Sequence, residues 1–168
     1  MKAIPMISLV ISVLFFSCNP GKSIRTNYYT KGNLIYRFGN NKPYNGDIIA
    51  KTEGKLFEYK VKDGVKNGEF KITFDNGHLI MKGNIVDDNN EGKWVYFYPS
   101  GELESEGYFK NNLPDSIWTW YFPDGRVKEK GLFVKGIRRG DWKMYDEIGT
   151  ITMENMYVVG ADSTKRKK

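Results

Sequence analysis

The stretch GKWVYFYPSGELESEGYF, residues 92–109, contains the spacing on which most of the chain is built. Its glycines, at 92, 101 and 107, have counterparts at 68, 77 and 83, and two of the three also recur at the same spacing in each later unit. A fixed period of a few tens of residues over most of a chain indicates a repeat architecture with one supersecondary unit per period. Three tryptophans keep the same step: Trp94, Trp118 and Trp142.

Each unit has the composition of a β-hairpin. About five residues of alternating aromatic or β-branched character precede a turn and about seven follow it, which are strand lengths. The turn from Tyr98 to Gly101 places Pro99 where a fixed negative φ is needed and glycine where φ is positive. No helical period is present. We therefore predict an all-β fold, an elongated and twisted antiparallel β-meander of tandem 24-residue hairpin repeats with about ten to twelve strands.

The domain organisation follows from this period. We expect a signal peptide at 1–17, a tether at 18–26, a repeat domain at 27–160 and a basic tail at 161–168. Two irregular units, 27–45 and 46–67, come before the regular units 68–91, 92–115, 116–139 and 140–160. Ser116 is the only residue other than glycine at the opening position of a regular unit.

The N-terminus has the pattern of an export signal. Lys2 is followed by an apolar run to Phe16, which is short for a membrane span, and then by Ser17 and Cys18. The segment from Leu14 to Cys18 resembles a bacterial lipoprotein signal, although Phe15 departs from the usual aliphatic residue. This resemblance implies lipid attachment at Cys18, an N-terminal acyl anchor in the lipid bilayer and a place in the bacterial cell envelope. The alternative is an ordinary secretory signal in which the cysteine is there by chance.

Asn19 follows the cysteine, where the resemblance implies sorting to the outer membrane, facing the periplasm or the exterior.

The chain's charge does not predict a nucleic-acid partner. Of the formal net charge of +6, four come from residues 165–168 and one from Lys2, which leaves about +1 for the rest of the chain. This excludes a basic nucleic-acid-binding face on the repeats. The terminal lysines could contact anionic lipid or form a solvated tail.

The strand register determines which side chains share a face. Apolar matching places Phe74 opposite Leu79 and Tyr98 opposite Leu103. It also predicts that each tryptophan ring lies over a glycine of the strand it pairs with, Gly107 for Trp94 and Gly131 for Trp118. We assign this face to internal packing, with the following aromatic and apolar members: Trp94, Tyr96, Tyr98, Trp118, Trp120, Phe122, Trp142 and Met144.

The other face has a thinner aromatic row, and this row is the candidate binding site. Phe97, Tyr121 and Tyr145 lie one period apart and would align across successive hairpins. A partly apolar stripe of this kind suits the extended chain of a protein partner or a polymer. The alternative is an unoccupied aromatic ladder that only stabilises the sheet. Beside the row we expect Tyr108, Leu132 and Met156.

The residues do not predict catalytic chemistry, a metal site or a cofactor. His78 is the only histidine and follows a turn glycine, where an exposed loop position is the simpler interpretation. One histidine and one cysteine cannot supply a metal cluster or a serine-histidine-aspartate arrangement. The carboxylates of Glu102, Glu104 and Glu106 are expected on one strand face, in cross-strand ion pairs with Lys128 and Lys130.

The spacing of residues 92–94, 96–98, Gly101, Leu103 and 107–108 resembles the bacterial variant of the MORN (membrane occupation and recognition nexus) repeat over residues 44–160. The resemblance implies a non-enzymatic scaffold that binds a protein partner, in a family whose members are often lipoproteins and are often labelled antitoxin-like. The aromatic rows are also similar to those of choline- and glucan-binding hairpin repeats. Glycan or choline-type binding, or an antitoxin or immunity-like role, is therefore the alternative.

Overall fold

The computed structural model describes residues 27–158, which form twelve β-strands and no helix. The strands have these bounds: β1 Tyr28–Lys31, β2 Leu34–Arg37, β3 Gly46–Thr52, β4 Lys55–Lys62, β5 Val65–Phe74, β6 Leu79–Val86, β7 Asn89–Phe97, β8 Leu103–Lys110, β9 Leu113–Tyr121, β10 Val127–Val134, β11 Ile137–Tyr145 and β12 Ile151–Tyr157. The predicted all-β class is confirmed. The expected signal peptide, Cys18, tether and basic tail lie outside the described residues.

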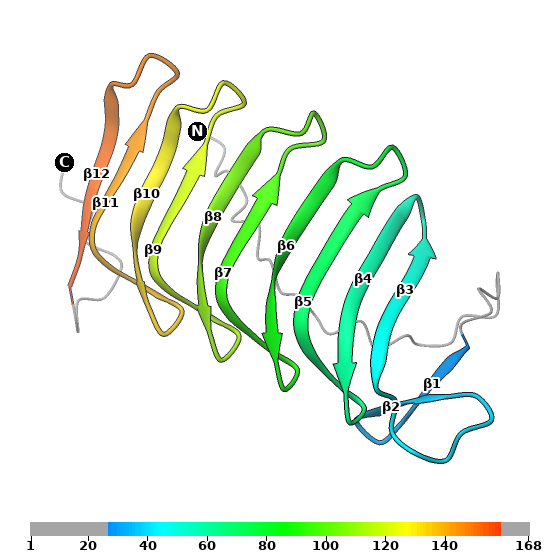
Figure 1. Ribbon diagram of the computed structural model, residues 1–168. Coiled ribbons are helices and arrows are strands. Elements are labelled where there is room, and N and C mark those ends of the chain that lie inside the picture. Colours follow the sequence, from blue (N-terminus) through cyan, green and yellow to red (C-terminus); the bar gives the residue numbers. More distant parts are fainter. Residues whose placement is uncertain (1–26, 159–168) are drawn as a thin grey trace.

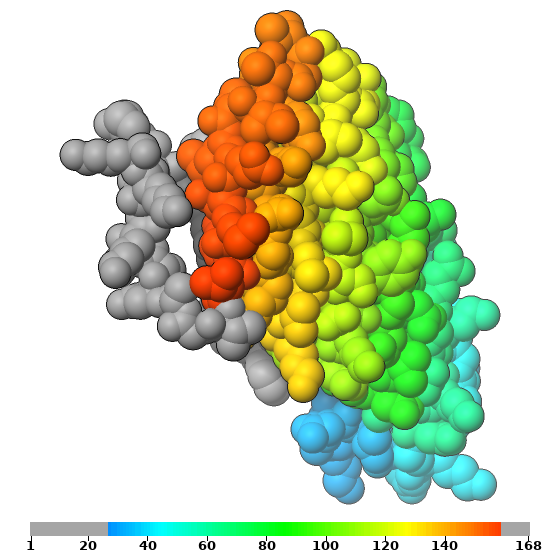
Figure 2. Space-filling view, turned by 90° about the vertical axis from the view of Figure 1, so that its left-hand side faces the viewer, coloured from blue at the N-terminus to red at the C-terminus, as the bar shows by residue number. Residues whose placement is uncertain are grey.

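Strands β3 to β12 form one antiparallel sheet in which every strand pairs with its neighbours in chain order. Figure 1 shows this meander, with each odd-numbered strand running to the upper end of the sheet and each even-numbered strand returning to the lower end. Seen from the β12 edge in Figure 2, β1 and β2 project at the lower end. The predicted antiparallel β-meander is therefore confirmed from β3 onward.

Strands β1 and β2 pair with each other in a separate two-stranded sheet, and Tyr36 of β2 also forms an isolated bridge with Pro43. They adjoin the turn between β4 and β5, where the Ile35 N–H donates to the Gly64 carbonyl at 2.8 Å. The Gly64 N–H in turn donates to the Tyr44 carbonyl at 2.9 Å. The first irregular unit therefore meets the array at the end of a hairpin and does not extend the sheet as another strand.

The connections at the lower end are two-residue turns. Asp87 and Asp88 both have positive φ, 48° and 62°, and the pair Asn111 and Asn112 is the same, at 50° and 64°. Positive φ at both central residues defines the type I′ turn, which matches the twist of the flanking strands. The next strand therefore begins directly after each turn, for example at Asn89.

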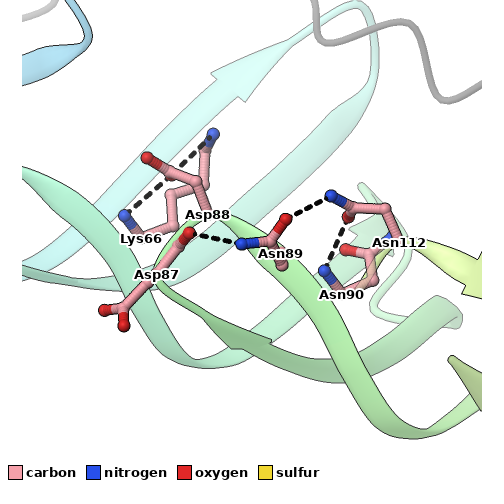
Figure 3. A network of polar contacts seen from close by, with 6 residues as sticks. All are labelled: Lys66, Asp87, Asp88, Asn89, Asn90 and Asn112. Atoms are coloured by element: carbon pink, nitrogen blue, oxygen red, sulfur yellow. Dashed lines mark hydrogen bonds and ion pairs between the residues drawn. The ribbon is translucent and has the colours of Figure 1, made fainter. Parts of the chain in front are cut away.

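Side chains link each lower turn to the next, as Figure 3 shows. Asp88 Oδ1 accepts a hydrogen bond from the Lys66 N–H at 2.9 Å and lies 3.5 Å from Lys66 Nζ. One repeat further on, Asn112 Oδ1 accepts from the Asn90 N–H at 2.7 Å, and Asn112 Nδ2 donates to Asn89 Oδ1 at 2.7 Å. Short polar side chains thus hydrogen-bond the backbone at the lower ends of neighbouring hairpins.

The tryptophan rings lie over glycines, but on the other neighbouring strand from the one expected. Trp94 is opposite Gly107 in the register, as predicted. Its ring nevertheless covers Gly83 of the preceding strand, and the ring of Trp118 covers Gly107: a Cβ added at either glycine would lie 2.1 Å from Cδ2 of the ring. The expectation that Trp94 covers Gly107 and Trp118 covers Gly131 is therefore wrong. The contact joins consecutive repeats and not the two strands of one hairpin.

A second aromatic position completes the packing on this face, which we call the tryptophan face. Phe109 meets Trp94 and Trp118 edge-on, with ring centroids 5.8 and 5.2 Å apart, and Phe133 meets Trp142 in the same way at 5.0 Å. Edge-to-face pairs of this kind stabilise beyond the burial of their area. The sequence interpretation missed this position, although it also recurs once per period: Val61, Ile85, Phe109, Phe133 and Tyr157.

The register changes near the upper turns because each hairpin from β5 onward contains a β-bulge. Ile72 pairs with Met81 as predicted, but Leu79 pairs with Thr73 and not with Phe74. Likewise Leu103 pairs with Phe97, so the expected partner Tyr98 lies beyond the last residue of β7. A bulge places two residues of one strand against one of the other and shifts the pairing on one side only.

The opening position of each regular unit requires positive φ. Gly68, Gly92 and Gly140 have φ of 123°, 71° and 61°, and Ser116 adopts 63° at the equivalent place. Left-handed backbone costs an L-residue roughly 1 to 2 kcal/mol, whereas glycine adopts it without this penalty. Ser116 is therefore a strained exception to a position where glycine is otherwise used.

We expect Gly107→Ala to lower the free energy of unfolding by about 2 to 3 kcal/mol, because the added methyl group collides with the Trp118 ring. Chemical denaturation followed by tryptophan fluorescence measures the change. The control is Gly92→Ala. No atom lies within 4 Å of a Cβ added at Gly92, so only the backbone penalty of about 1 kcal/mol applies. Equal costs for the two variants would contradict the close approach of ring and glycine.

We expect Ser116→Gly to raise the free energy of unfolding by about 1 kcal/mol, because it removes left-handed strain that the other three units avoid. The same denaturation experiment measures this gain. The Ser116 hydroxyl donates to Asp115 Oδ1 at 3.3 Å. A loss of stability in the variant would show that this hydrogen bond stabilises the protein by more than the left-handed backbone destabilises it.

Candidate functional site

The face opposite the tryptophans contains the candidate aromatic row. The structure places Phe97, Tyr121 and Tyr145 at the upper ends of β7, β9 and β11, all partly buried. They do not stack on one another, because an aliphatic side chain of the intervening strand lies between them. The register pairs Phe97 with Leu103 and Tyr121 with Val127. Within residues 27–158 no ring contact joins the three, so the row is a mixed apolar stripe and not an aromatic ladder.

Tyr121 is fixed by a charged group at the centre of this face. Its hydroxyl donates to Glu106 Oε1 at 2.9 Å, and Lys93 Nζ lies 2.7 Å from Glu106 Oε2. The hydrogen bond from Lys93 lowers the pKa of Glu106, and the Tyr121 hydroxyl lowers it further. Burial raises the pKa of Tyr121, as does its bond to the carboxylate. The carboxylate is therefore ionised at neutral pH and holds the Tyr121 ring in place.

The expected ion pairs of the glutamates with Lys128 and Lys130 are wrong. Glu106 pairs with Lys93 of the preceding strand in the same hairpin. Strand β9 stands between β8 and β10, so residues on those two strands are about 10 Å apart. Lys128 instead places its ammonium group 5.7 Å from the centroid of the Phe122 ring.

The tryptophan face offers little access to a ligand. Trp94, Trp118 and Trp142 are only 1%, 5% and 2% exposed. The Trp118 Nε1–H donates to the Tyr108 carbonyl at 3.0 Å and the Trp142 Nε1–H to the Leu132 carbonyl at 3.1 Å. Any ligand would have to displace rings that already cover the neighbouring repeat. The tryptophan face therefore serves to pack the repeats against one another.

Two buried polar atoms on the tryptophan face lack a hydrogen-bond partner among the described residues. They are Trp94 Nε1 and the Tyr96 hydroxyl. Burial raises the pKa of Tyr96, so its proton stays in place at any physiological pH. The two rings are near neighbours, with centroids 6.5 Å apart. Both groups lie in the middle of the packed face and not on an accessible surface.

Sequence reasoning missed a second apolar surface on the face of the aromatic row, at the lower ends of β8 to β11. We call it the lower patch, and its side chains are 42% to 54% exposed: Tyr108, Leu113, Ile117, Val134 and Ile137. Tyr108 and Leu132 were expected beside the aromatic row and share its face, but they lie toward the lower end of the sheet. The sequence does contain a signal for this patch, because equivalent positions of successive repeats change from polar to apolar residues.

The remaining candidate residues do not assemble a chemical site. His78 is exposed, and its Nδ1 lies 3.2 Å from the carbonyl of Pro99 in the next upper turn. No group of three or more potential metal ligands occurs within residues 27–158. In the same part of the chain, no helix is long and apolar enough to cross a membrane.

Taken together, the fold and this surface define a class of protein, a β-hairpin repeat array with one face packed and the other partly exposed. Two consecutive segments, residues 90–111 and 114–135, match the family model of the MORN repeat variant. The resemblance to a MORN repeat variant is thereby confirmed for these segments, which cover β7 to β10 except the first residues of β7 and β9. No curated protein matches the chain.

One solved structure with similarity to the chain is the crystal structure of a mutant of S. aureus TarM in complex with fondaparinux, alpha-GlcNAc-glycerol and UDP. The identity is 16% and the TM-score 0.33, over 67% of this chain and 21% of that one. This chain therefore spans about a fifth of the length of that protein.

Proposed function

We propose that this protein is a non-enzymatic scaffold whose repeat array binds a protein partner on the face that carries the aromatic row. The observation behind the proposal is a difference between the two faces. The tryptophan face keeps the same kinds of residue from unit to unit and is buried, as a structural surface requires. The opposite face changes its residues between units while the backbone stays the same. The matches to the MORN repeat variant agree with a binding role.

The aromatic row illustrates this difference between units. Thr73 occupies the position of Phe97, Tyr121 and Tyr145 in the first regular unit, so the hairpin does not require an aromatic ring there. Leu103 and Val127 fill the spaces between the rings, which leaves no open slot between paired aromatics for a sugar or a quaternary amine. A continuous apolar stripe favours a polypeptide partner over a glycan.

We further propose that the protein is a lipid-anchored protein of the bacterial cell envelope, with Cys18 as the modified residue. The support is the order of residues 1–18, with a charged start, an apolar run and a small residue before the cysteine. Such an anchor would hold the repeats at a membrane surface and leave their exposed face free for a partner.

We expect the combined change Phe97→Thr, Tyr121→Thr and Tyr145→Thr to abolish partner capture while the protein still folds. Threonine is the residue that the chain itself has at position 73. Chemical crosslinking in living cells measures the capture, and thermal unfolding of the purified variant measures the stability. Capture of every wild-type partner by the folded variant would show that the row only stabilises the sheet.

We expect Cys18→Ser to release the protein from the membrane fraction, because the side chain that would carry the lipid is lost. Cell fractionation measures the release, and mass spectrometry of the wild-type protein should find an acylated cysteine as its first residue. Membrane retention of the variant, or an unmodified N-terminus in the wild type, would refute the anchor.

A further inference from the structure

We propose that the lower patch is the docking site for an amphipathic helix of the protein partner, with acidic residues along the edges of its apolar stripe. The inference rests on the proposed binding function and specifies where and with what chemistry the partner engages. It concerns a surface distinct from the aromatic row, which lies at the upper ends of the same strands.

The first support is that the fold does not need apolar residues at these positions. Tyr108 corresponds to Asn84 one repeat earlier, and both Leu113 and Ile137 correspond to Asn89. Those polar residues occupy the same hairpin geometry without disturbing it. Apolar side chains that the fold does not need, yet that are gathered on one exposed surface, mark an interaction site.

The second support is that the patch is continuous. Ile117 pairs directly with Leu132, and Val134 with Ile137, so apolar side chains meet across β9, β10 and β11. Leu113 extends this surface, since it adjoins the turn after Val134: a Cβ added at Gly136 would lie 3.4 Å from its Cδ2. Leu113, Ile117, Val134 and Ile137 thus form one surface with Leu132, and Tyr108 borders it on β8, where it pairs with Asp115.

The size of the patch suits a helix. Strands lie about 4.8 Å apart, so β8 to β11 span about 14 Å across the sheet, and the five residues from Leu113 to Ile117 span about 13 Å along it. A helix is about 10 to 12 Å wide, and residues i to i+7 of its apolar stripe cover about 10 Å. Two turns of an amphipathic helix would therefore cover the patch, with anchors at i, i+3, i+4 and i+7.

The third support is the charge around the patch. Lys110 pairs with Leu113 in the register, Lys135 lies in the turn between Val134 and Ile137, and Arg139 pairs with Leu132. Within residues 27–158 none of these three cations forms a salt bridge. The nearby Asp115 is engaged instead with the backbone, because its Oδ2 accepts the Lys135 N–H at 3.1 Å. Unpaired cations at the border favour a partner with acidic flanks.

The test uses a designed 14-residue helical peptide with Leu at i, i+3, i+4 and i+7 and Glu beside them, and the same peptide with Lys in place of Glu. The full chain is titrated with each by fluorescence anisotropy. The patch variant combines Tyr108→Asn, Leu113→Asn and Ile137→Asn, which are the residues of the preceding repeats. The charge variant combines Lys135→Asn and Arg139→Asn, since Asn111 and Asn67 occupy those positions in other units.

We expect the acidic peptide to bind, and the patch variant to bind it at least about tenfold more weakly, because it loses three of the five apolar side chains of the patch. The charge variant should bind it several-fold more weakly at low salt, and the difference should shrink as salt is added. The basic peptide should bind more weakly than the acidic one.

Several results would overturn the proposal. One is equal binding of the two peptides, or acidic-peptide binding that the patch variant retains. Others are patch-dependent dimerisation in sedimentation velocity, which would identify a second copy as the occupant, or patch-dependent binding to vesicles of phosphatidylglycerol and phosphatidylethanolamine. If the row variant loses cellular crosslinks while the patch variant keeps them all, this inference fails and the proposed function stands. If both variants keep them, both fail.

Discussion

The contact of each tryptophan ring with a glycine of the preceding repeat is the constraint on which the array depends. The pairs are Gly83 with Trp94, Gly107 with Trp118 and Gly131 with Trp142. Only glycine leaves room for a ring to lie flat on a neighbouring strand, so each repeat becomes the base for the next. The stability of such an array comes from contacts between neighbouring repeats and not from a single core.

The ends of the array are marked by changes in this pair. Tyr59 of the second irregular unit occupies the glycine position and Phe70 of the first regular unit occupies the tryptophan position. Their rings stack with centroids 6.0 Å apart, and neither ring lies on bare backbone. At the other end Asn155 takes the glycine position, opposite Trp142, on the last described strand. The glycine position thus carries a side chain on the last described strand, where no tryptophan ring of a following repeat lies over it. Ring and glycine therefore change together at both ends.

A similar matching occurs in the lower turns. Asp88 and Asn112 each accept a backbone N–H of the preceding repeat through their side chains. At the next turn Pro114 has no N–H to donate, and the residue facing it, Gly136, has no side chain that could accept one. The backbone bond between the two residues is still made, because the Gly136 N–H donates to the Pro114 carbonyl at 2.7 Å. Partners one repeat apart thus compensate for each other, which keeps buried and turn backbone groups satisfied.

Much of this fold could be predicted from the period alone, because a 24-residue repeat of strand-forming residues with turn glycines permits few arrangements. The roles of the glycines under the tryptophans could be foreseen, but not which neighbouring strand each ring covers, since both strands offer a glycine. The bulges that move Leu103 from Tyr98 to Phe97 depend on backbone geometry that composition does not reveal. The lower patch was missed because its members, such as Ile117 and Ile137, do not recur at every repeat.

A double-mutant cycle tests the central claim most directly. Trp118→Leu is combined in turn with Gly107→Ala and with Gly131→Ala, and the free energy of unfolding is measured for each variant. If the Trp118 ring rests on Gly107, removing the ring should abolish most of the cost of Gly107→Ala, a coupling of about 2 kcal/mol. The cost of Gly131→Ala, which collides with Trp142, should remain. Strong coupling of Trp118 to Gly131 with none to Gly107 would contradict the packing of each ring on the preceding repeat.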